Sequence, residues 1–428
     1  MESWFKLSQH NSSVRIEATA GLTTFLAMAY ISVVNPSILS QAGMDFGAVF
    51  VATCIAAAFG SIVMGLYGNY PIAQAPGMGQ NAFFTFTVVL GMGHSWQTAL
   101  GAVFISGVIF VVLSVLPVRE WLVNSIPRNM KLGMAAGIGL FLGFIALKNS
   151  GVIIDSEATL VTLGDIVRFE PIACILGFVV IAALSAQGIS GAVLIGILLV
   201  ALAGWLTGNA DFTGILALPP SPAPVLLQLD IGSALQLSMV TVILSMLIVD
   251  VFDTAGTLIG VATRAQLLDD DGRLPRLRKA LLSDSSATVV GALAGTSSTT
   301  SYIESAAGVE AGGKTGLTAV VCGMLFIGCL FFAPLAQSVP AYATASALLF
   351  VACLMARSLA DVDWQDITES APAVVAAISM PLTFSIADGI GLGFITYALM
   401  KVLSRRASQC SPAVYVIALI FALKYLYL

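Results

Sequence analysis

Residues 235–263 read LQLSMVTVILSMLIVDVFDTAGTLIGVAT, an apolar stretch that contains only two charged residues. At about 1.5 Å per residue, a helix of this length crosses the ~30 Å hydrocarbon core of a bilayer. Each carboxylate near the bilayer centre costs on the order of 2.5–3.5 kcal/mol on insertion scales. Asp250, Asp253 and Thr257 are spaced i, i+3 and i+7, so they share one face of the helix. The stretch therefore predicts a membrane span whose polar face forms the wall of a binding site.

The rest of the chain has the composition of an integral membrane protein. Apolar residues make up 58% of the 428 residues and charged residues only 10%, too little charge to keep a soluble fold dispersed. We predict an all-α integral membrane fold with 14 transmembrane segments. The expected spans lie at 16–38, 47–66, 72–91, 97–117, 132–150, 171–187, 190–208, 235–261, 280–294, 298–313, 315–335, 341–358, 369–384 and 386–402. The last apolar stretch, 412–428, is short and either crosses the membrane or lies in its interface.

The positions of Lys and Arg predict the orientation of the spans. Cytoplasmic segments of membrane proteins carry an excess of basic residues. Such residues follow the fourth, eighth and fourteenth expected spans: Arg119, Arg128 and Lys131; Arg264, Arg273, Arg276, Arg278 and Lys279; Lys401, Arg405 and Arg406. We therefore expect a multi-pass protein of the inner (plasma) membrane with a cytoplasmic N-terminus.

An internal duplication is expected on either side of the 262–280 loop. Seven spans lie on each side of this loop, and an odd number in each unit makes the two units inverted relative to each other. Pro171–Leu206 and Ala371–Leu403 both consist of two short apolar segments joined by small residues, at 188–191 and 387–391. The alternative is that any two membrane segments resemble each other at this level of detail.

The tenth expected span is too polar for a lipid-facing helix. Residues 295–314 read GTSSTTSYIESAAGVEAGGK, and the run Thr299–Ile303 favours an extended backbone. Irregular backbone at membrane depth survives only where protein or a water-filled cavity covers it. We expect an extended piece followed by a half-helix from about Ser305, with Glu304 at its positive end. A re-entrant loop without a ligand is the alternative.

The third expected span is broken in a similar way. Residues 71–84 read PIAQAPGMGQNAFF, in which prolines remove backbone donors and glycines allow close approach. This composition predicts a second extended piece. Gln80 and Asn81 are expected to face Glu304 across the pseudo-symmetry axis, and Phe83 or Phe84 to stack on a flat ligand.

Carboxylates are the expected carriers of any coupled proton. The two histidines, His10 and His94, fall in the N-terminal tail and in a short loop, where neither would relay a proton inside the membrane. Proton coupling is therefore expected at acids of the spans, namely Asp250, Asp253, Asp284 and Glu304.

Asp284 follows the basic loop directly and is expected to cap the ninth span, to pair with Lys279 or Arg278, or to support the site from behind. The six cysteines are scattered without the spacing of metal ligands. We expect no metal, no cofactor, no enzymatic activity and no nucleic-acid partner.

Five motifs resemble those of one transporter family. They are AGLTTF at 20–25 with Ala29-Tyr30 and Asn35-Pro36, APGMGQNA at 75–82, DVFDTAGTL at 250–258, SSTTSYIESAAG at 297–308 and GGKTGLTA at 312–319. With these motifs the chain resembles the nucleobase:cation symporter-2 (nucleobase–ascorbate) superfamily, in particular its AzgA-like branch of adenine, guanine and hypoxanthine permeases. The resemblance covers nearly the whole chain.

The resemblance implies a fold and a function. The fold would be two inverted repeats of seven spans, with a core domain at 1–117 and 235–337 and a gate domain at 118–234 and 338–428, the latter ending in the C-terminal apolar segment. The function would be proton-coupled import of a purine nucleobase by alternating access of core against gate, in a protein that could form a homodimer. Asp253 and Glu304 would hold the base; the other expected binding residues are Gln80, Asn81, Phe83, Phe84, Thr257 and Ile303.

Other functions are open at this stage. A transporter of uracil or xanthine, or an anion transporter of the same fold, is the main alternative, although an acid-lined site repels anions. A channel would show a polar stripe through several spans, whereas polarity here gathers near three. The residues do not decide which purine is preferred, or between proton and sodium coupling.

Overall fold

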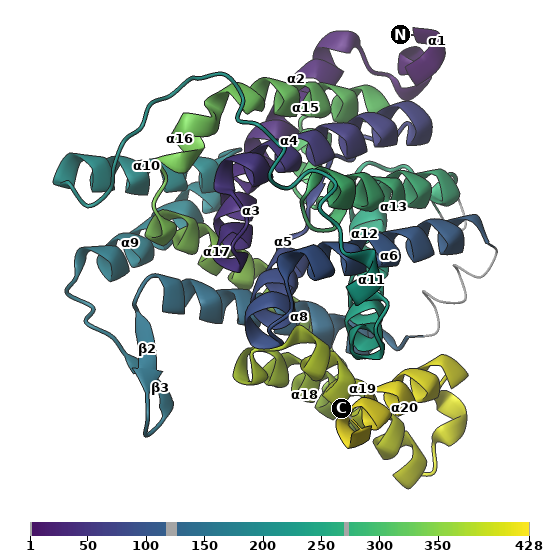
Figure 1. Ribbon diagram of the computed structural model, residues 1–428. Helices are drawn as coiled ribbons and strands as arrows, with labels where there is room; N and C mark the ends of the chain where they lie inside the picture. Colours follow the sequence, from purple (N-terminus) through teal and green to yellow (C-terminus); the bar gives the residue numbers. More distant parts are fainter. Residues whose placement is uncertain (1, 117–125, 269–273, 428) are drawn as a thin grey trace.

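The protein is a helical membrane-type fold, seen here in a computed structural model that describes residues 2–116, 126–268 and 274–427 (Figure 1). Within these residues, nine helical segments are long and apolar enough to cross a membrane, and three further apolar helices are shorter. Arg119 and Arg273, expected in basic loops, lie outside the described residues.

The long helices fall largely within the expected apolar runs, and several short elements lie between or before them. The first stretch forms α1 (Glu2–Phe5), η1 (Leu7–His10), α2 (Val14–Met28), α3 (Ile31–Leu39), η2 (Ser40–Ala42), α4 (Phe46–Val63), η3 (Met64–Gly68), β1 (Gln74–Pro76), α5 (Met78–Ala82), η4 (Phe83–Gly91) and α6 (Trp96–Val115). After the gap come α8 (Arg128–Asn149), β2 (Ile153–Ser156), β3 (Leu160–Leu163), α9 (Phe169–Ala186), α10 (Ala192–Thr207), α11 (Ile231–Ala234), η5 (Leu237–Met239) and α12 (Val240–Arg264).

The remaining elements complete the chain. They are α13 (Leu277–Ala294), β4 (Thr299–Ser301), α14 (Ser305–Glu310), α15 (Gly316–Cys329), η6 (Leu330–Phe332), α16 (Ala333–Gln337), α17 (Ala341–Ala356), η7 (Arg357–Asp361), α18 (Ile367–Thr383), α19 (Ile386–Leu403), η8 (Ala407–Gln409) and α20 (Pro412–Tyr427). The C-terminal apolar stretch is thus a helix, and it packs against α19 and α12.

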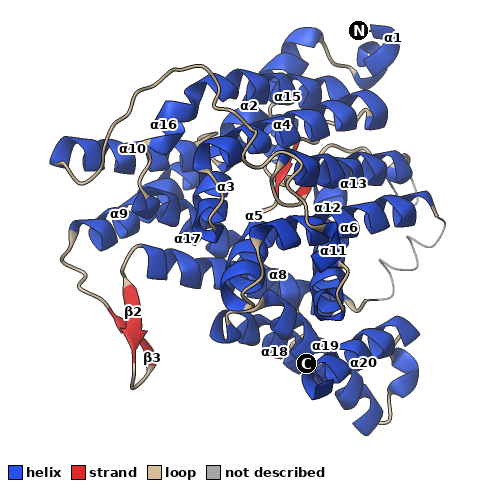
Figure 2. Ribbon diagram, in the orientation of Figure 1, coloured by secondary structure: helices blue, strands red, loops and turns tan. Residues whose placement is uncertain are grey.

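The two extended pieces expected in the third and tenth runs are confirmed, and they pair with each other. β1 and β4 are antiparallel, with Ala75 opposite Thr300, and they lie in the middle of the helices (Figure 2). The ladder continues beyond the strands, because Gly77 N donates to Ser298 O at 2.9 Å and Tyr302 N donates to Ala73 O at 3.0 Å. Each broken span thereby satisfies backbone groups that lipid could not satisfy.

The helices pack into two groups. One, here called the β1–β4 group, contains α2 to α6 and α11 to α16 with the two strands; the other, the α8 group, contains α8 to α10 and α17 to α20. Glycine allows the closest approaches inside each group. A Cβ on Gly133 of α8 would lie 2.5 Å from the carbonyl oxygen of Ala373 in α18, and one on Gly21 of α2 would lie 2.7 Å from that of Thr318 in α15.

The two expected small-residue hinges have different outcomes. The first is confirmed, because α9 ends at Ala186, α10 begins at Ala192, and Gly188 and Gly191 between them have positive φ. The second prediction is wrong: residues 387–391 lie inside α19. The break falls instead at Phe384, which has a φ of 55°, and Ser385 caps α19 by accepting a hydrogen bond from the Asp388 amide.

Candidate functional site

A cavity of about 530 Å³ brings together four of the residues expected to bind a ligand. Asp253 is exposed to this cavity, next to the partly exposed Phe252 on the same helix α12. Gln80 and Thr257 also line it, although both are mostly buried, and Ile303 presents a side chain that is 49% exposed. The facing wall comes from the α8 group and consists of Arg128, Lys131, Leu132, Met134, Ala135, Ile138 and Met355.

Asp250 lies behind the cavity and not on its surface. Its side chain is fully buried, and its carboxylate accepts hydrogen bonds from Gln80 Nε2 at 3.0 Å and Thr288 Oγ1 at 3.1 Å. Because the Gln80 amide is used in this way, Asp250 orients a side chain that does line the cavity. Of the three residues expected to form one wall, Asp253 and Thr257 line the cavity and Asp250 does not.

Asp284 holds the strand β4 in place. Its Oδ1 accepts from the Ser301 amide at 2.8 Å, from Ser301 Oγ at 2.7 Å and from Gln74 Nε2 at 3.2 Å, and its Oδ2 accepts from Thr254 Oγ1 at 2.6 Å. The residue is buried in the interior of α13, so the expectations of a helix cap or of a pair with Lys279 or Arg278 are wrong. The third expectation, that Asp284 supports the site from behind, agrees with these contacts.

Glu304 is the residue before α14, as expected, but it lines a different cavity from Asp253. The second cavity measures about 490 Å³, and its walls include Tyr30, Glu304 and the loop Gly188–Gly191. The Tyr30 hydroxyl donates to Glu304 Oε1 at 2.7 Å.

The two amides of the third span do not face Glu304. Gln80 points to Asp250, while the Asn81 side-chain oxygen accepts a hydrogen bond from Ser297. The prediction of amides opposite Glu304 is wrong because the β1–β4 ladder brings these residues to the buried side of α12 and to the start of the tenth span. Asn81 is fully buried and is absent from the walls of both cavities.

Phe83 and Phe84, which were expected to stack on a flat ligand, lie away from both cavities. Both rings are buried in the main hydrophobic core, at 2% and 0% exposure, and neither lines the two cavities. They lie in a π-helical segment, η4, whose wider turn places successive side chains differently from an α-helix. The aromatic ring at the first cavity is that of Phe252, with Lys131 Nζ 4.9 Å from its centroid.

Several contacts at the site were not expected from the sequence. They involve Tyr30, Gln74, Thr254, Thr288 and Ser301 as donors to carboxylates. The one available signal was the motif around Ala29-Tyr30, where a tyrosine interrupts an apolar run shortly before a proline. Among the residues that the structure describes, no group of three or more His, Cys, Asp and Glu is arranged to hold a metal ion.

Known proteins match this chain over nearly its whole length. The adenine permease AdeP of Escherichia coli is 48% identical over 100% of this chain and 96% of its own. The guanine/hypoxanthine permease PbuG of Bacillus subtilis is 45% identical over 100% of both chains. Among solved structures, the transmembrane domain of the cyanobacterial bicarbonate transporter BicA aligns with a TM-score of 0.68 at 16% identity, over 88% of this chain and 96% of that one.

At 16% identity the likeness to BicA shows the fold alone, whereas the two permeases share nearly half of their residues with this chain. Residues 15–392 match the family model Xan_ur_permease, described as a permease family. The close relatives are named as permeases and not as enzymes. The chain is therefore a multi-pass membrane transport protein that belongs to the Xan_ur_permease family, the nucleobase:cation symporter-2 family.

Proposed function

We propose that this protein imports purine nucleobases together with protons. The observation that carries the proposal is the Asp253 carboxylate, which opens into a cavity of about 530 Å³ walled by Phe252 and Ile303. A flat heterocycle with polar edges fits an apolar cavity that has few, well-placed polar groups. The names of the adenine and guanine/hypoxanthine permeases support a purine as the ligand.

The chemistry of the cavity suits a nucleobase. An ionised carboxylate accepts two parallel N–H bonds, such as those from N1–H and the 2-amino group of guanine. Adenine offers a donor beside an acceptor, which a protonated acid or the amide of Gln80 matches better. The expected binding set of Asp253, Glu304, Gln80, Thr257 and Ile303 therefore stays part of the proposal.

The surroundings of the four expected proton carriers favour two of them, Asp253 and Glu304, as the group that binds the coupled proton. Asp250 and Asp284 are fully buried and engaged with neighbouring donors, whereas Asp253 and Glu304 line cavities that water can enter. We assign the coupled proton to Asp253 or Glu304, and to Asp250 and Asp284 the task of holding the surrounding polar groups.

Alternating access would move the two helix groups against each other. Both cavities lie between the groups: α5 and α12 face α8 and α17 across the first, and α2 and α14 face α9, α10 and α17 across the second. The β1–β4 group corresponds to the proposed core domain (1–117 and 235–337). Apart from α11 (Ile231–Ala234), which packs in the β1–β4 group, the proposed gate domain (118–234 and 338–428) corresponds to the α8 group. Fourteen spans in two inverted repeats of seven stay part of the proposal.

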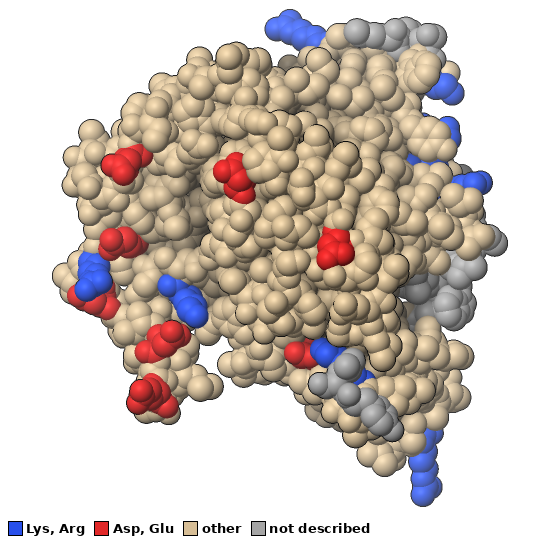
Figure 3. Space-filling model, in the orientation of Figure 1, with Lys and Arg blue, Asp and Glu red and all other residues tan. Residues whose placement is uncertain are grey.

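The distribution of charge supports a cytoplasmic N-terminus. In Figure 3 most Lys and Arg side chains stand along the side that carries the N-terminus, while Asp and Glu gather mainly toward the side of the β2–β3 hairpin. With this orientation Arg128 and Lys131, which line the first cavity, would lie on its cytoplasmic side. The inner membrane and a homodimer remain predictions from the family resemblance.

Uptake by cells that lack their own purine permeases tests the proposal. Radiolabelled adenine, hypoxanthine, guanine, uracil and xanthine should each be offered with and without a proton uncoupler, with sulfate and bicarbonate as anion substrates. We expect accumulation of at least one purine that the uncoupler abolishes. Accumulation of uracil or an anion alone would contradict the substrate class, and purine accumulation that follows sodium and ignores the uncoupler would contradict proton coupling.

A further inference from the structure

Glu304 is held away from the cavity that Asp253 lines. Ile303 lines the first cavity and Glu304 the second, so the turn at these two residues separates the cavities. The Glu304 side chain is half-buried, and its Oε1 accepts the Tyr30 hydroxyl at 2.7 Å. In this position the carboxylate faces the second cavity and Tyr30, and it would have to turn toward Asp253 to share a ligand with it.

Tyr30 is well placed to hold this carboxylate. It lies at the break between α2 and α3, and its side chain is fully buried although it borders the second cavity. The Tyr30 carbonyl accepts hydrogen bonds from the amides of Val33 and Val34, both at 3.0 Å, which fix the backbone of the break. The buried ring thus directs its hydroxyl to Glu304 Oε1.

We propose that Tyr30 is a positioning residue that retains Glu304 in the second cavity while the site is empty. This inference rests on the proposed function. Glu304 gives up the Tyr30 hydrogen bond when it joins Asp253 on a bound base, and it recovers that bond when the base leaves. Tyr30 therefore weakens binding from the cytoplasmic side and favours release.

The size of the effect follows from the hydrogen bond that is broken. A hydrogen bond to an ionised carboxylate is stronger than one between neutral groups, and its loss shifts an equilibrium by about tenfold or more. When only a fraction of the protein has Glu304 free to bind, the apparent dissociation constant rises by the inverse of that fraction. Removing the hydroxyl should thus tighten binding about tenfold and slow release.

The chain offers a matched control for this substitution. Tyr397 also donates its hydroxyl to a glutamate, Glu369, with a distance of 2.9 Å to Oε1. It belongs to α19 and lines neither cavity. Tyr397→Phe removes the same chemical bond as Tyr30→Phe, but away from the proposed binding groups.

The experiment measures affinity and turnover in the full-length protein. Radiolabelled adenine, or hypoxanthine if the wild type takes it up better, is used to obtain Kd in detergent and the maximal release rate from proteoliposomes. We expect Tyr30→Phe to lower Kd about tenfold and to lower the maximal rate, and Tyr397→Phe to leave Kd unchanged. A merely structural tyrosine would not produce tighter binding with slower turnover.

Two results would overturn the inference: an unchanged or higher Kd in Tyr30→Phe, or an equal decrease in Tyr397→Phe. If Tyr30→Phe does not reach the membrane, Tyr30→Met, which also lacks the donor, carries the same expectation. A wild-type protein that binds no purine would refute the proposed function. A wild type that binds purine beside a Tyr30→Phe variant that binds no tighter would refute only the role of Tyr30.

Discussion

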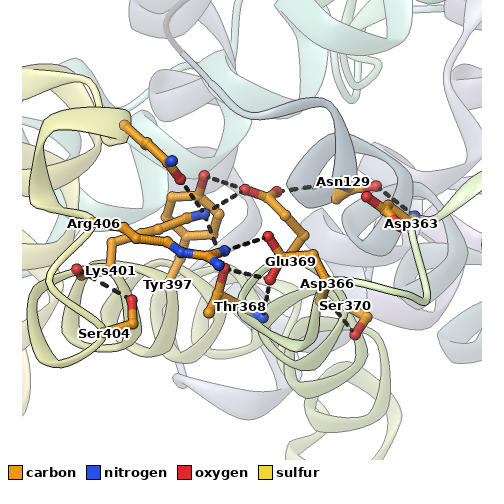
Figure 4. A network of polar contacts seen from close by, with 11 residues as sticks. Asn129, Asp363, Asp366, Thr368, Glu369, Ser370, Tyr397, Lys401, Ser404 and Arg406 are labelled. Atoms are coloured by element: carbon orange, nitrogen blue, oxygen red, sulfur yellow. Dashed lines mark hydrogen bonds and ion pairs between the residues drawn. The ribbon is translucent and has the colours of Figure 1, made fainter.

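The buried ion pair between Lys401 and Glu369 allows a stability change to be predicted from the structure. Lys401 Nζ lies 2.8 Å from Glu369 Oε1 and donates to Thr368 Oγ1 at 3.0 Å, and its side chain is 1% exposed (Figure 4). Glu369→Gln leaves this ammonium group buried without its carboxylate partner. Removal of one member of a buried pair costs about 3–5 kcal/mol of unfolding free energy.

The opposite substitution should cost less. In Lys401→Met, the Glu369 carboxylate still accepts from the Tyr397 hydroxyl at 2.9 Å and from Asn129 Nδ2 at 3.0 Å (Figure 4). Its side chain is also 18% exposed, so water reaches it. We expect a loss of about 1–3 kcal/mol, the range for a hydrogen-bonded group that loses one partner. The double variant should recover part of the loss of Glu369→Gln because no buried charge is left unpaired.

Unfolding of the purified protein in detergent, followed by tryptophan fluorescence, measures these losses. The control is Arg406→Gln, because Arg406 pairs with Asp366 at 2.7 Å while both side chains are substantially exposed, at 46% and 30%. Exposed pairs contribute about 0–1 kcal/mol. The reasoning fails if Glu369→Gln is no less stable than Arg406→Gln, or if the double variant loses the sum of the two single losses.

Three further predictions concern transport, packing and pH. Asp253→Asn should abolish purine accumulation while the protein still inserts in the membrane, and normal uptake by this variant would remove Asp253 from the mechanism. Gly133→Ala should destabilise the protein by about 1–3 kcal/mol, since the added Cβ meets the backbone of Ala373. The control Gly328→Ala should not destabilise it, because a Cβ there meets nothing within 4 Å. Equal melting temperatures of the two variants would contradict this prediction. Hydrogen bonds from the Thr368 side chain and amide hold the pKa of Asp366 below its usual range. The stability that Asp366 adds at neutral pH is therefore lost as the pH falls through that lowered pKa. The melting-temperature gap to Asp366→Asn should close below about pH 4, and a gap that persists in acid would contradict this.

The sequence predicted the elements of this fold well because its main signals are local. A run such as 47–66 is almost entirely apolar, and α4 follows it closely. The breaks in the third and tenth spans were also visible, because Pro71, Pro76 and the run from Thr296 to Ser301 cannot form a lipid-facing helix. Local composition decides these features before any packing forms.

The partners of the site residues could not be predicted in the same way. Tyr30 and Glu304 are separated by 274 positions, and Gln80 and Asp250 by 170. A helical period tells which residues share a face but not toward which neighbour that face turns. Phe83 was expected at the site because an aromatic ring can stack on a flat ligand, yet its ring is buried in the core.

The site groups belong to one half of the molecule, and this restricts how a transport cycle could operate. Every hydrogen bond described above for Asp250, Asp284 and Glu304 comes from within the β1–β4 group. The α8 group contributes to both cavities only their opposite walls, such as Ile138 on the first and the loop Gly188–Gly191 on the second. A relative motion of the two groups would therefore open or close the cavities without breaking these bonds. The proposed movement of Glu304 away from Tyr30 does break one of these hydrogen bonds, so the ligand must drive it. The affinity of Tyr30→Phe for a purine therefore distinguishes a positioning role of Tyr30 from a structural one.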